Sequence, residues 1–124
     1  MKLLDDVKLL NDNYKNKGLT KGMIGTIVDA DIRWNCFCVN FQDQRIYDKN
    51  FINNEESLLK LKNDIYTEIK IEDMEVIKSS DCTDEYLKEN LPLAYKDCWC
   101  KVENGYIMNA EGKKKNKIPY DYNS

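Results

Sequence analysis

The sequence predicts a mostly β (α+β) fold: a small β-barrel with a short inserted helix, followed by a helix and a C-terminal β-hairpin. Three observations lead to this prediction. Gly18, Gly22 and Gly25 are spaced to let the backbone bend sharply around a β-branched run. Apolar and polar residues alternate over residues 36–41, as they do in a half-buried strand. Asn104-Gly105 lies between two apolar-rich runs and is the preferred pair for a two-residue hairpin turn.

The first strands of the predicted barrel lie on either side of these glycines. In order, we expect a strand at residues 5–10, a polar loop at 11–17, a turn at 18–22, a strand that ends at Val28, a loop at 29–35 and a strand at 36–41. Gly25 falls inside the second strand, where a glycine commonly marks a bulge or a close backbone approach. The period of two puts Phe37, Val39 and Phe41 together on one face of the third strand.

A short inserted helix is expected next. Residues 42–45 read as a turn, and 46–47 are expected to begin a short strand. The helix starts after Asn53-Asn54, because asparagine caps free amides and the two glutamates that follow complement the helix dipole. Apolar residues at helical spacing continue the pattern, namely Leu58, Leu61 and Ile65.

Two further strands complete the predicted barrel. Period two returns over residues 66–71, which places Glu68 and Lys70 outward and Thr67, Ile69 and Ile71 inward. A turn then leads into a last barrel strand that ends at Ile77. We therefore expect two parts, a barrel at residues 1–78 and an extension at 79–124 that packs on it.

The extension is predicted to hold a helix and the hairpin. Thr83 is expected to cap the helix, and Pro92 to stop it. The hairpin pairs residues 98–103 with 106–108 through a type I′ turn. Residues 118–122 contain a proline and are expected to form an edge strand or an extended tail.

The order of these elements resembles a known family. Gly18-Leu-Thr-Lys-Gly-Met-Ile-Gly-Thr-Ile-Val28, a strand that ends at Val39-Asn-Phe41, and Met74-Glu-Val-Ile77 are similar to the pattern of SH3-like small barrels of the KOW type. They resemble more closely a family of small uncharacterised bacterial domains with that barrel. The resemblance covers residues 4–78, with 51–63 as an insertion, and it implies an SH3-like barrel. A shared fold says little about function, although the KOW type implies a nucleic-acid- or ribosome-associated module.

Composition argues against several classes of function. Charged residues make up 33% of the 124 residues, and the net charge is −3. A general nucleic-acid binder needs a basic surface, and this chain has arginine only at positions 33 and 45. Histidine is absent, which removes the commonest general base and the Cys-His and Ser-His nucleophile pairs. We therefore expect no enzyme activity and no catalytic residues.

The cysteines have two interpretations. Cys36-x-Cys38 and Cys98-x-Cys100 together suggest a four-cysteine zinc site, because thiolates are good zinc ligands. The spacing is shorter than usual, and free cysteine also packs as a small hydrophobe. We favour packing, and we expect no metal and no cofactor. Five cysteines without an export signal or a membrane-length apolar run predict reduced thiols and a cytoplasmic protein.

Two remaining features bear on binding. Trp34 is expected in a loop, where a tryptophan is either a lid on the barrel or an interface anchor, and both interpretations are kept. The lysines at 113–115 and 117 lie near Tyr120 and Tyr122, a combination that can hold single-stranded nucleic acid. On a charged turn they more often stay solvated and discourage edge pairing, which we favour.

The most specific functional hypothesis is a bacterial immunity protein that binds and neutralises a cognate toxin. Small size, acidic balance and the lack of catalytic chemistry favour it, because immunity proteins of nuclease toxins often cover a basic site. The expected partner is a basic toxin domain, contacted through Asp29, Asp31, Trp34 and Asp43. The alternative is the nucleic-acid- or ribosome-associated KOW-like module.

Overall fold

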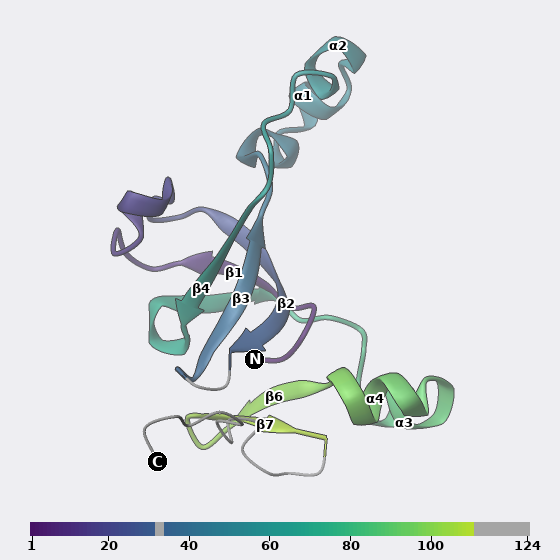
Figure 1. Ribbon diagram of the computed structural model, residues 1–124. Helices are drawn as coiled ribbons and strands as arrows, with labels where there is room; N and C mark the ends of the chain where they lie inside the picture. Colours follow the sequence, from purple (N-terminus) through teal and green to yellow (C-terminus); the bar gives the residue numbers. More distant parts are fainter. Residues whose placement is uncertain (32–33, 111–124) are drawn as a thin grey trace.

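The computed structural model describes residues 1–31 and 34–110. Its centre is a five-stranded antiparallel sheet in the order β4-β3-β2-β1-β5 (Figure 1). The strands are β1 (Asp6–Leu9), β2 (Ile24–Asp31), β3 (Cys36–Phe41), β4 (Ile65–Lys70) and β5 (Met74–Lys78). The prediction of a mostly β fold with short helices and a C-terminal hairpin is confirmed.

The hydrophobic core lies against one face of this sheet. Phe37, Val39 and Phe41 are all fully buried, which confirms that they share the inner face of β3. Val7, Leu9, Ile27 and Ile69 from the other strands complete the same cluster. Gly25 marks a close approach, because a Cβ there would lie 2.6 Å from Cγ1 of Val39 and 2.8 Å from the carbonyl oxygen of Asn40.

The sheet has two edges. Within the described residues β4 and β5 each pair with only one other strand, so the strand ladders do not close into a barrel. A short 3-10 helix, η3 (Ile71–Asp73), connects the two edge strands. The hydroxyl of Tyr14, from the β1–β2 loop, donates to Asp73 at 2.6 Å and accepts from the backbone amide of Lys70 at 3.0 Å. These two hydrogen bonds fix the β1–β2 loop to η3 and to the end of β4.

The boundary of β2 differs from the sequence prediction. Residues 29–31 were expected in a loop, but they continue the strand and pair with the beginning of β3. The register shifts between Ile27 and Asp29, so Val28 is an extra residue in the ladder. Aspartate has a low intrinsic preference for strands, and backbone pairing with β3 outweighs it here. The loop prediction for these residues was therefore wrong.

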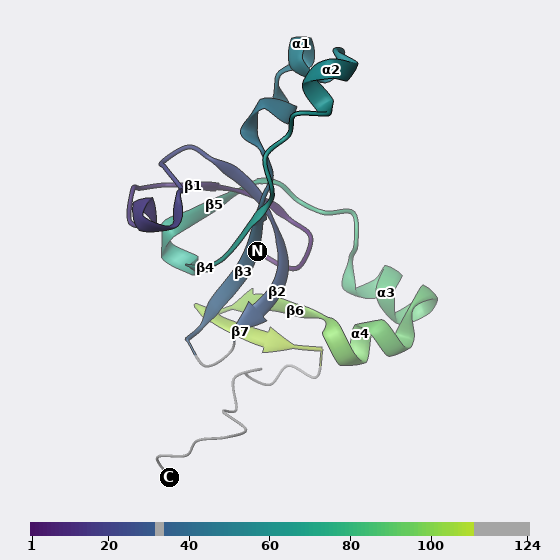
Figure 2. The same ribbon diagram turned by 45° about the horizontal axis from the view of Figure 1, so that its top comes forward.

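The connection from β3 to β4, residues 42–64, is named the arm. It holds η2 (Gln44–Tyr47), α1 (Lys49–Ile52) and α2 (Glu55–Leu58), and it projects beyond the end of the sheet (Figures 1 and 2). Residues 46–47 are helical, so the strand predicted there was wrong. Asn54 does cap α2, because its Oδ1 accepts from the amide of Glu56 at 3.0 Å.

The arm corrects the predicted helix in two further ways. The helix ends at Leu58, so Leu61 and Ile65 do not continue its face, and Ile65 begins β4. The sequence prediction also missed α1, which Asp48 caps by accepting from the amide of Asn50 at 2.9 Å. Leu58, Leu59 and Leu61 are all exposed. Their helical spacing therefore did not reflect burial of one face.

The C-terminal extension begins with two helices, α3 (Asp84–Asn90) and α4 (Pro92–Cys98). Thr83 caps α3 as expected, since its hydroxyl accepts from the amide of Tyr86 at 3.1 Å. The second helix was not predicted. Pro92 stands at its first position, where the missing N–H would have had no helical partner. Cys98 therefore ends a helix, and the strand predicted at that residue was wrong.

The hairpin follows as β6 (Cys100–Glu103) and β7 (Tyr106–Asn109). Asn104 and Gly105 both have positive φ, 52° and 81°, which confirms the type I′ turn. The amide of Val102 donates to the carbonyl of Met1 at 2.8 Å, so the N-terminus runs beside β6. Cys100 and Ile107 belong to the same hydrophobic cluster as the sheet. The strand or tail expected at 118–122 and the lysines at 113–117 lie outside the described residues.

Candidate functional site

The antiparallel register gathers side chains from three strands on the outer face of the sheet. Residues directly opposite one another in paired strands point to the same side. One such row is Asp31, Cys36 and Lys70, from β2, β3 and β4 in turn. The next row is Asp29, Cys38 and Glu68. These two rows are named the acidic face, because they hold three carboxylates and one ammonium group.

Trp34 lies at one end of the acidic face, in the turn from β2 to β3. Its side chain is 69% exposed, so the ring does not cover the core, and the interpretation as a lid is wrong. Its amide donates to the carbonyl of Asp31 at 3.4 Å, which places it directly beside the first row. A large exposed aromatic next to carboxylates is the arrangement expected of an interface anchor with a polar surround.

Asn35 holds this turn in place. It has a positive φ of 53°, and its side chain reaches the hairpin. Its Nδ2 donates to the carbonyl of Gly105 at 2.8 Å, and its Oδ1 accepts from the amide of Ile107 at 2.9 Å. Sequence reasoning missed this role, although asparagine is one of the residues that tolerate a left-handed conformation. The position of Trp34 is therefore fixed by two separate parts of the chain.

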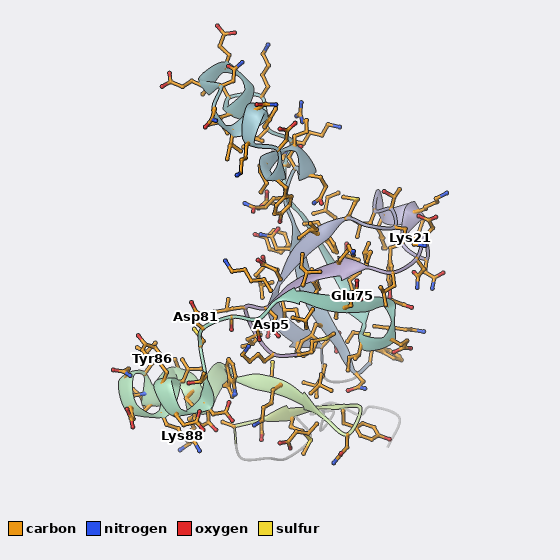
Figure 3. All side chains as sticks on the ribbon, turned by 180° about the vertical axis from the view of Figure 1, so that it is seen from behind. Asp5, Lys21, Glu75, Asp81, Tyr86 and Lys88 are labelled. Carbon is orange, nitrogen blue, oxygen red and sulfur yellow. The ribbon has the colours of Figure 1, made fainter. Side chains whose placement is uncertain are left out.

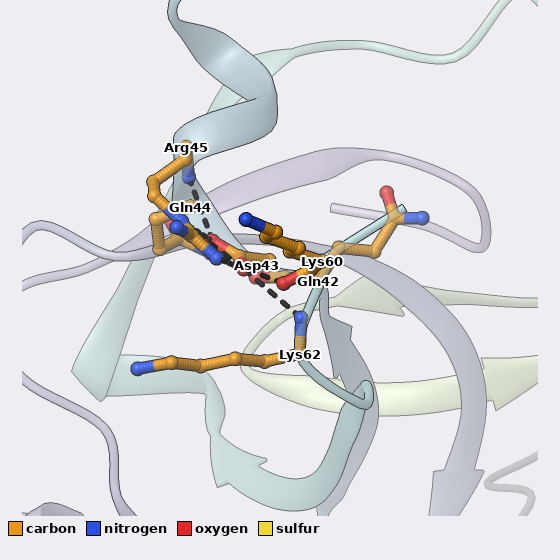
Figure 4. Close-up of polar contacts among 6 residues, drawn as sticks. All are labelled: Gln42, Asp43, Gln44, Arg45, Lys60 and Lys62. Carbon is orange, nitrogen blue, oxygen red and sulfur yellow. Dashed lines mark hydrogen bonds and ion pairs between the residues drawn. The ribbon is translucent and has the colours of Figure 1, made fainter. Parts of the chain in front are cut away.

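Of the predicted site residues, Asp29, Asp31 and Trp34 lie together, whereas Asp43 lies at the opposite end of β3. The Asp43 carboxylate is only 5% exposed and organises the base of the arm (Figure 4). It accepts from the amide and the guanidinium of Arg45 and from the amide of Lys62, the last at 3.0 Å. The Arg45 guanidinium and these amides hold the pKa of the Asp43 carboxyl well below its usual range.

The two cysteines of the acidic face are kept protonated by their surroundings. Burial first, and then the carboxylates of Glu68 and Asp31, raise the pKa of the Cys36 thiol to about 11. The pKa of the Cys38 thiol is also raised, by burial and then by Asp29 and Glu68. The thiolate is the form that attacks electrophiles and binds metals, and this environment disfavours it.

The four-cysteine zinc site is not assembled. Cys100 is fully buried in the core cluster, which confirms the packing interpretation for that residue, whereas Cys36 and Cys38 are on the outer face of β3. Among the side chains that the structure describes, which do not include those of Asp97 and Cys98, no three of the types that ligate metals gather into a candidate site.

A polar cleft adjoins the acidic face. It has a volume of about 460 Å³ and lies between the β1–β2 loop and β4. Its lining includes Asn13, Asn16, Lys17, Tyr66 and Glu68. Glu68 therefore belongs both to the acidic face and to the wall of the cleft. Its outward direction was predicted from the period of two, but its place in one row with Cys38 and Asp29 required the strand order.

No family model, curated protein or solved structure matches this chain. Among the described helices, none has the length and apolar character needed to cross a bilayer.

Proposed function

We propose that this chain is a non-enzymatic protein-binding protein, specifically a bacterial immunity protein that neutralises a toxin through the acidic face and Trp34. The observation that carries the proposal is the 69% exposed Trp34 in the turn that follows Asp31, at the end of the two rows that hold Asp29, Asp31 and Glu68. A water-exposed tryptophan on a fixed turn has few other uses, and tryptophan is enriched among residues that dominate binding energy.

The charge of the molecule supports a basic partner. Beyond residue 110 the sequence has four lysines (Lys113, Lys114, Lys115 and Lys117) against two acids, Glu111 and Asp121. The described part is therefore more acidic than the net charge of −3 indicates. Complementary charge steers diffusing partners together and raises the association rate. A basic toxin domain would meet carboxylates on paired strands, which hold a binding site more precisely than a loop does.

The fold proposal is an SH3-like barrel at residues 1–78, with the arm inserted between its third and fourth strands. A five-strand order in which β1 and β5 are neighbours, with a 3-10 helix between β4 and β5, supports this proposal. The KOW-like alternative, a nucleic-acid- or ribosome-associated module, requires contacts to phosphate. The three carboxylates of the acidic face would repel phosphate, so we favour a protein partner.

Binding kinetics against the product of the neighbouring gene test the proposed function. Trp34→Ala should speed dissociation and weaken binding by about 2 kcal/mol, or about 30-fold, since a buried aromatic anchor mainly slows dissociation. Asp29→Asn with Asp31→Asn should slow association by about tenfold at low salt and less at high salt. The matched control is Glu55→Gln with Glu56→Gln, which makes the same change of charge on the arm.

The control pair should leave the association rate nearly unchanged. Equal slowing by both pairs would mean that net charge acts from a distance, and the acidic face would lose its special role. If the neighbouring product does not bind, while the protein retains a labelled RNA or co-purifies with ribosomes, the immunity function is wrong and the KOW-like module replaces it.

A further inference from the structure

An apolar groove separates the N-terminal segment from the two helices of the extension. It has a volume of about 220 Å³ and is lined by Leu3, Leu4, Leu87, Leu91, Ala94 and Trp99. An apolar cavity of about 150 Å³ is enough to take up a benzene molecule. The groove is therefore large enough for one leucine or phenylalanine side chain. Figure 3 shows this side of the molecule, with Asp81 on the link between the sheet and α3.

A polar hollow lies next to the groove. It has a volume of about 210 Å³, and its wall includes Asp6, Lys78, Ser79, Ser80 and Asp81. Leu4 lines both spaces, so they adjoin one another. Two carboxylates against one ammonium group give the hollow an excess of negative charge. A cationic side chain is its natural complement.

The residue between the two spaces is strained. Leu4 has a φ of +70°, a conformation that costs energy for any residue with a side chain, and it is 50% exposed. Its amide donates to the carbonyl of Ile27 at 2.8 Å, which holds the backbone in this shape. Strained residues occur preferentially at ligand clamps and active sites.

Trp99 provides an independent observation. The indole is only 4% exposed, and its Nε1 has no hydrogen-bond partner among the described residues. A buried tryptophan N–H usually finds an acceptor. Trp99 also lines the groove, so an occupant would bring acceptor atoms near the indole. The carbonyl of a peptide backbone is such an acceptor.

We propose that this surface binds a peptide segment of a partner protein that presents a bulky apolar side chain beside a lysine or arginine. The apolar side chain enters the groove, and the cation enters the polar hollow between Asp6 and Asp81. Asp6 accepts from the hydroxyl of Thr26 through Oδ1 at 2.8 Å, which fixes its carboxylate. The proposal goes beyond the proposed function, since it involves neither Trp34 nor the acidic face.

The test begins with a phage-displayed library of random peptides that is selected for binding to the full-length protein. Peptides that also bind the Ala94→Phe variant are then removed by counter-selection. Ala94 is exposed, so the added ring fills the groove without entering the core. Selected sequences should share a bulky apolar residue next to a lysine or arginine. Synthetic peptides of those sequences should bind the Ala94→Phe and Asp81→Lys variants at least about tenfold more weakly than the native protein.

Two matched controls accompany these variants. Leu93→Phe adds a ring on the same helix outside the groove, and Glu75→Lys makes the same charge reversal on β5; both should bind normally. Nuclear magnetic resonance supplies a direct readout, because Trp34 and Trp99 are the only tryptophans. Peptide binding should move the indole N–H resonance of Trp99 and leave that of Trp34 in place.

Four results would overturn the proposal. The first is a library that yields no common sequence. The second is a set of selected peptides that move only the Trp34 resonance. The third is a shift in the resonances of the groove residues when Ile118→Asp and Tyr120→Asp are introduced together in the full chain without peptide. That result would make the chain's own C-terminal residues the occupant. The fourth is a concentration-dependent dimer in sedimentation that Ala94→Phe abolishes, because the occupant would then be a second copy of the chain.

Discussion

The sheet and the arm both contain large apolar side chains, but only the sheet buries them fully. Phe37, Phe41 and Ile69 are fully buried in the core, against the inner face of the sheet. In the arm, Ile52 and Leu58 are exposed, and Leu59 is 87% exposed. The strands of the sheet contact one another across several residues each, whereas α1 and α2 are four residues long. The apolar side chains of the sheet are enclosed by one another, whereas those of the arm, apart from Phe51 under the Arg45 guanidinium, are largely in water.

This difference shows what holds each region together. The sheet is stabilised by burial, at about 25 cal/mol for each Å² of apolar surface removed from water. The arm depends on local hydrogen bonds at its turns and helix starts, made by Asp43, Asp48 and Asn54. Helices of one turn are not stable alone in water. We therefore expect the arm to unfold locally while the sheet unfolds only as a whole.

The largest expected contrast is in the free energy of unfolding, when one large side chain in each region is replaced by alanine. Phe37→Ala should lower the free energy of unfolding by about 3–5 kcal/mol, because it leaves a cavity in the core. Leu59→Ala should change it by less than about 0.5 kcal/mol, because the side chain is already in water. Chemical denaturation of both variants measures the difference. Similar losses would mean that the arm belongs to the cooperative core.

A smaller contrast is expected from removing a helix cap in each region. Thr83→Ala should cost about 1 kcal/mol of global stability, because α3 packs through Leu87 and the cap supports that packing. Asn54→Ala removes the matching cap from α2 and should leave global unfolding unchanged, since the arm already opens separately. Thermal unfolding checks both, and an equal fall in the two melting temperatures would contradict the separation.

The smallest effect is a pH dependence confined to the arm. The pKa of Asp43 is lowered in the folded chain, so its stabilising contacts are complete above its unfolded pKa of about 4. Their contribution to stability declines as the pH falls below that value, and the contacts themselves break as the pH falls through the lowered pKa of the folded state. The amide resonances of Arg45 and Lys62, which donate to Asp43, should therefore change on acidification before those of β3. The Asp43→Asn variant should lack this early change.

The sequence predicted the elements of the sheet better than those of the arm. Burial on one face leaves a period of two, which is why β1, β3 and β4 could be placed with their inner residues. The strand character of Asp29–Asp31 was missed, because it depends on pairing with β3 rather than on the residues themselves. The arm's leucines have helical spacing without burial, so they misled the prediction of α2.

The candidate site was predictable only in part. Asp29, Asp31 and Trp34 are close in the sequence and stay close in the fold. Glu68 joins them through the strand order, which no local pattern encodes. Asp43 is separated from them by the length of β3, and its carboxylate faces Arg45. Neighbouring acids in a sequence become one surface only where the register of the sheet brings them together.

Hydroxyl-radical footprinting of the complex tests the central claim most directly, because it reports the accessibility of single side chains. In the free protein Trp34 and Leu59 should both be oxidised readily, and buried Trp99 should not. We predict that binding of the neighbouring gene's product protects Trp34 and leaves Leu59 as reactive as before. Protection of Leu59 with Trp34 unchanged would place the partner on the arm and contradict the assignment of binding to the acidic face.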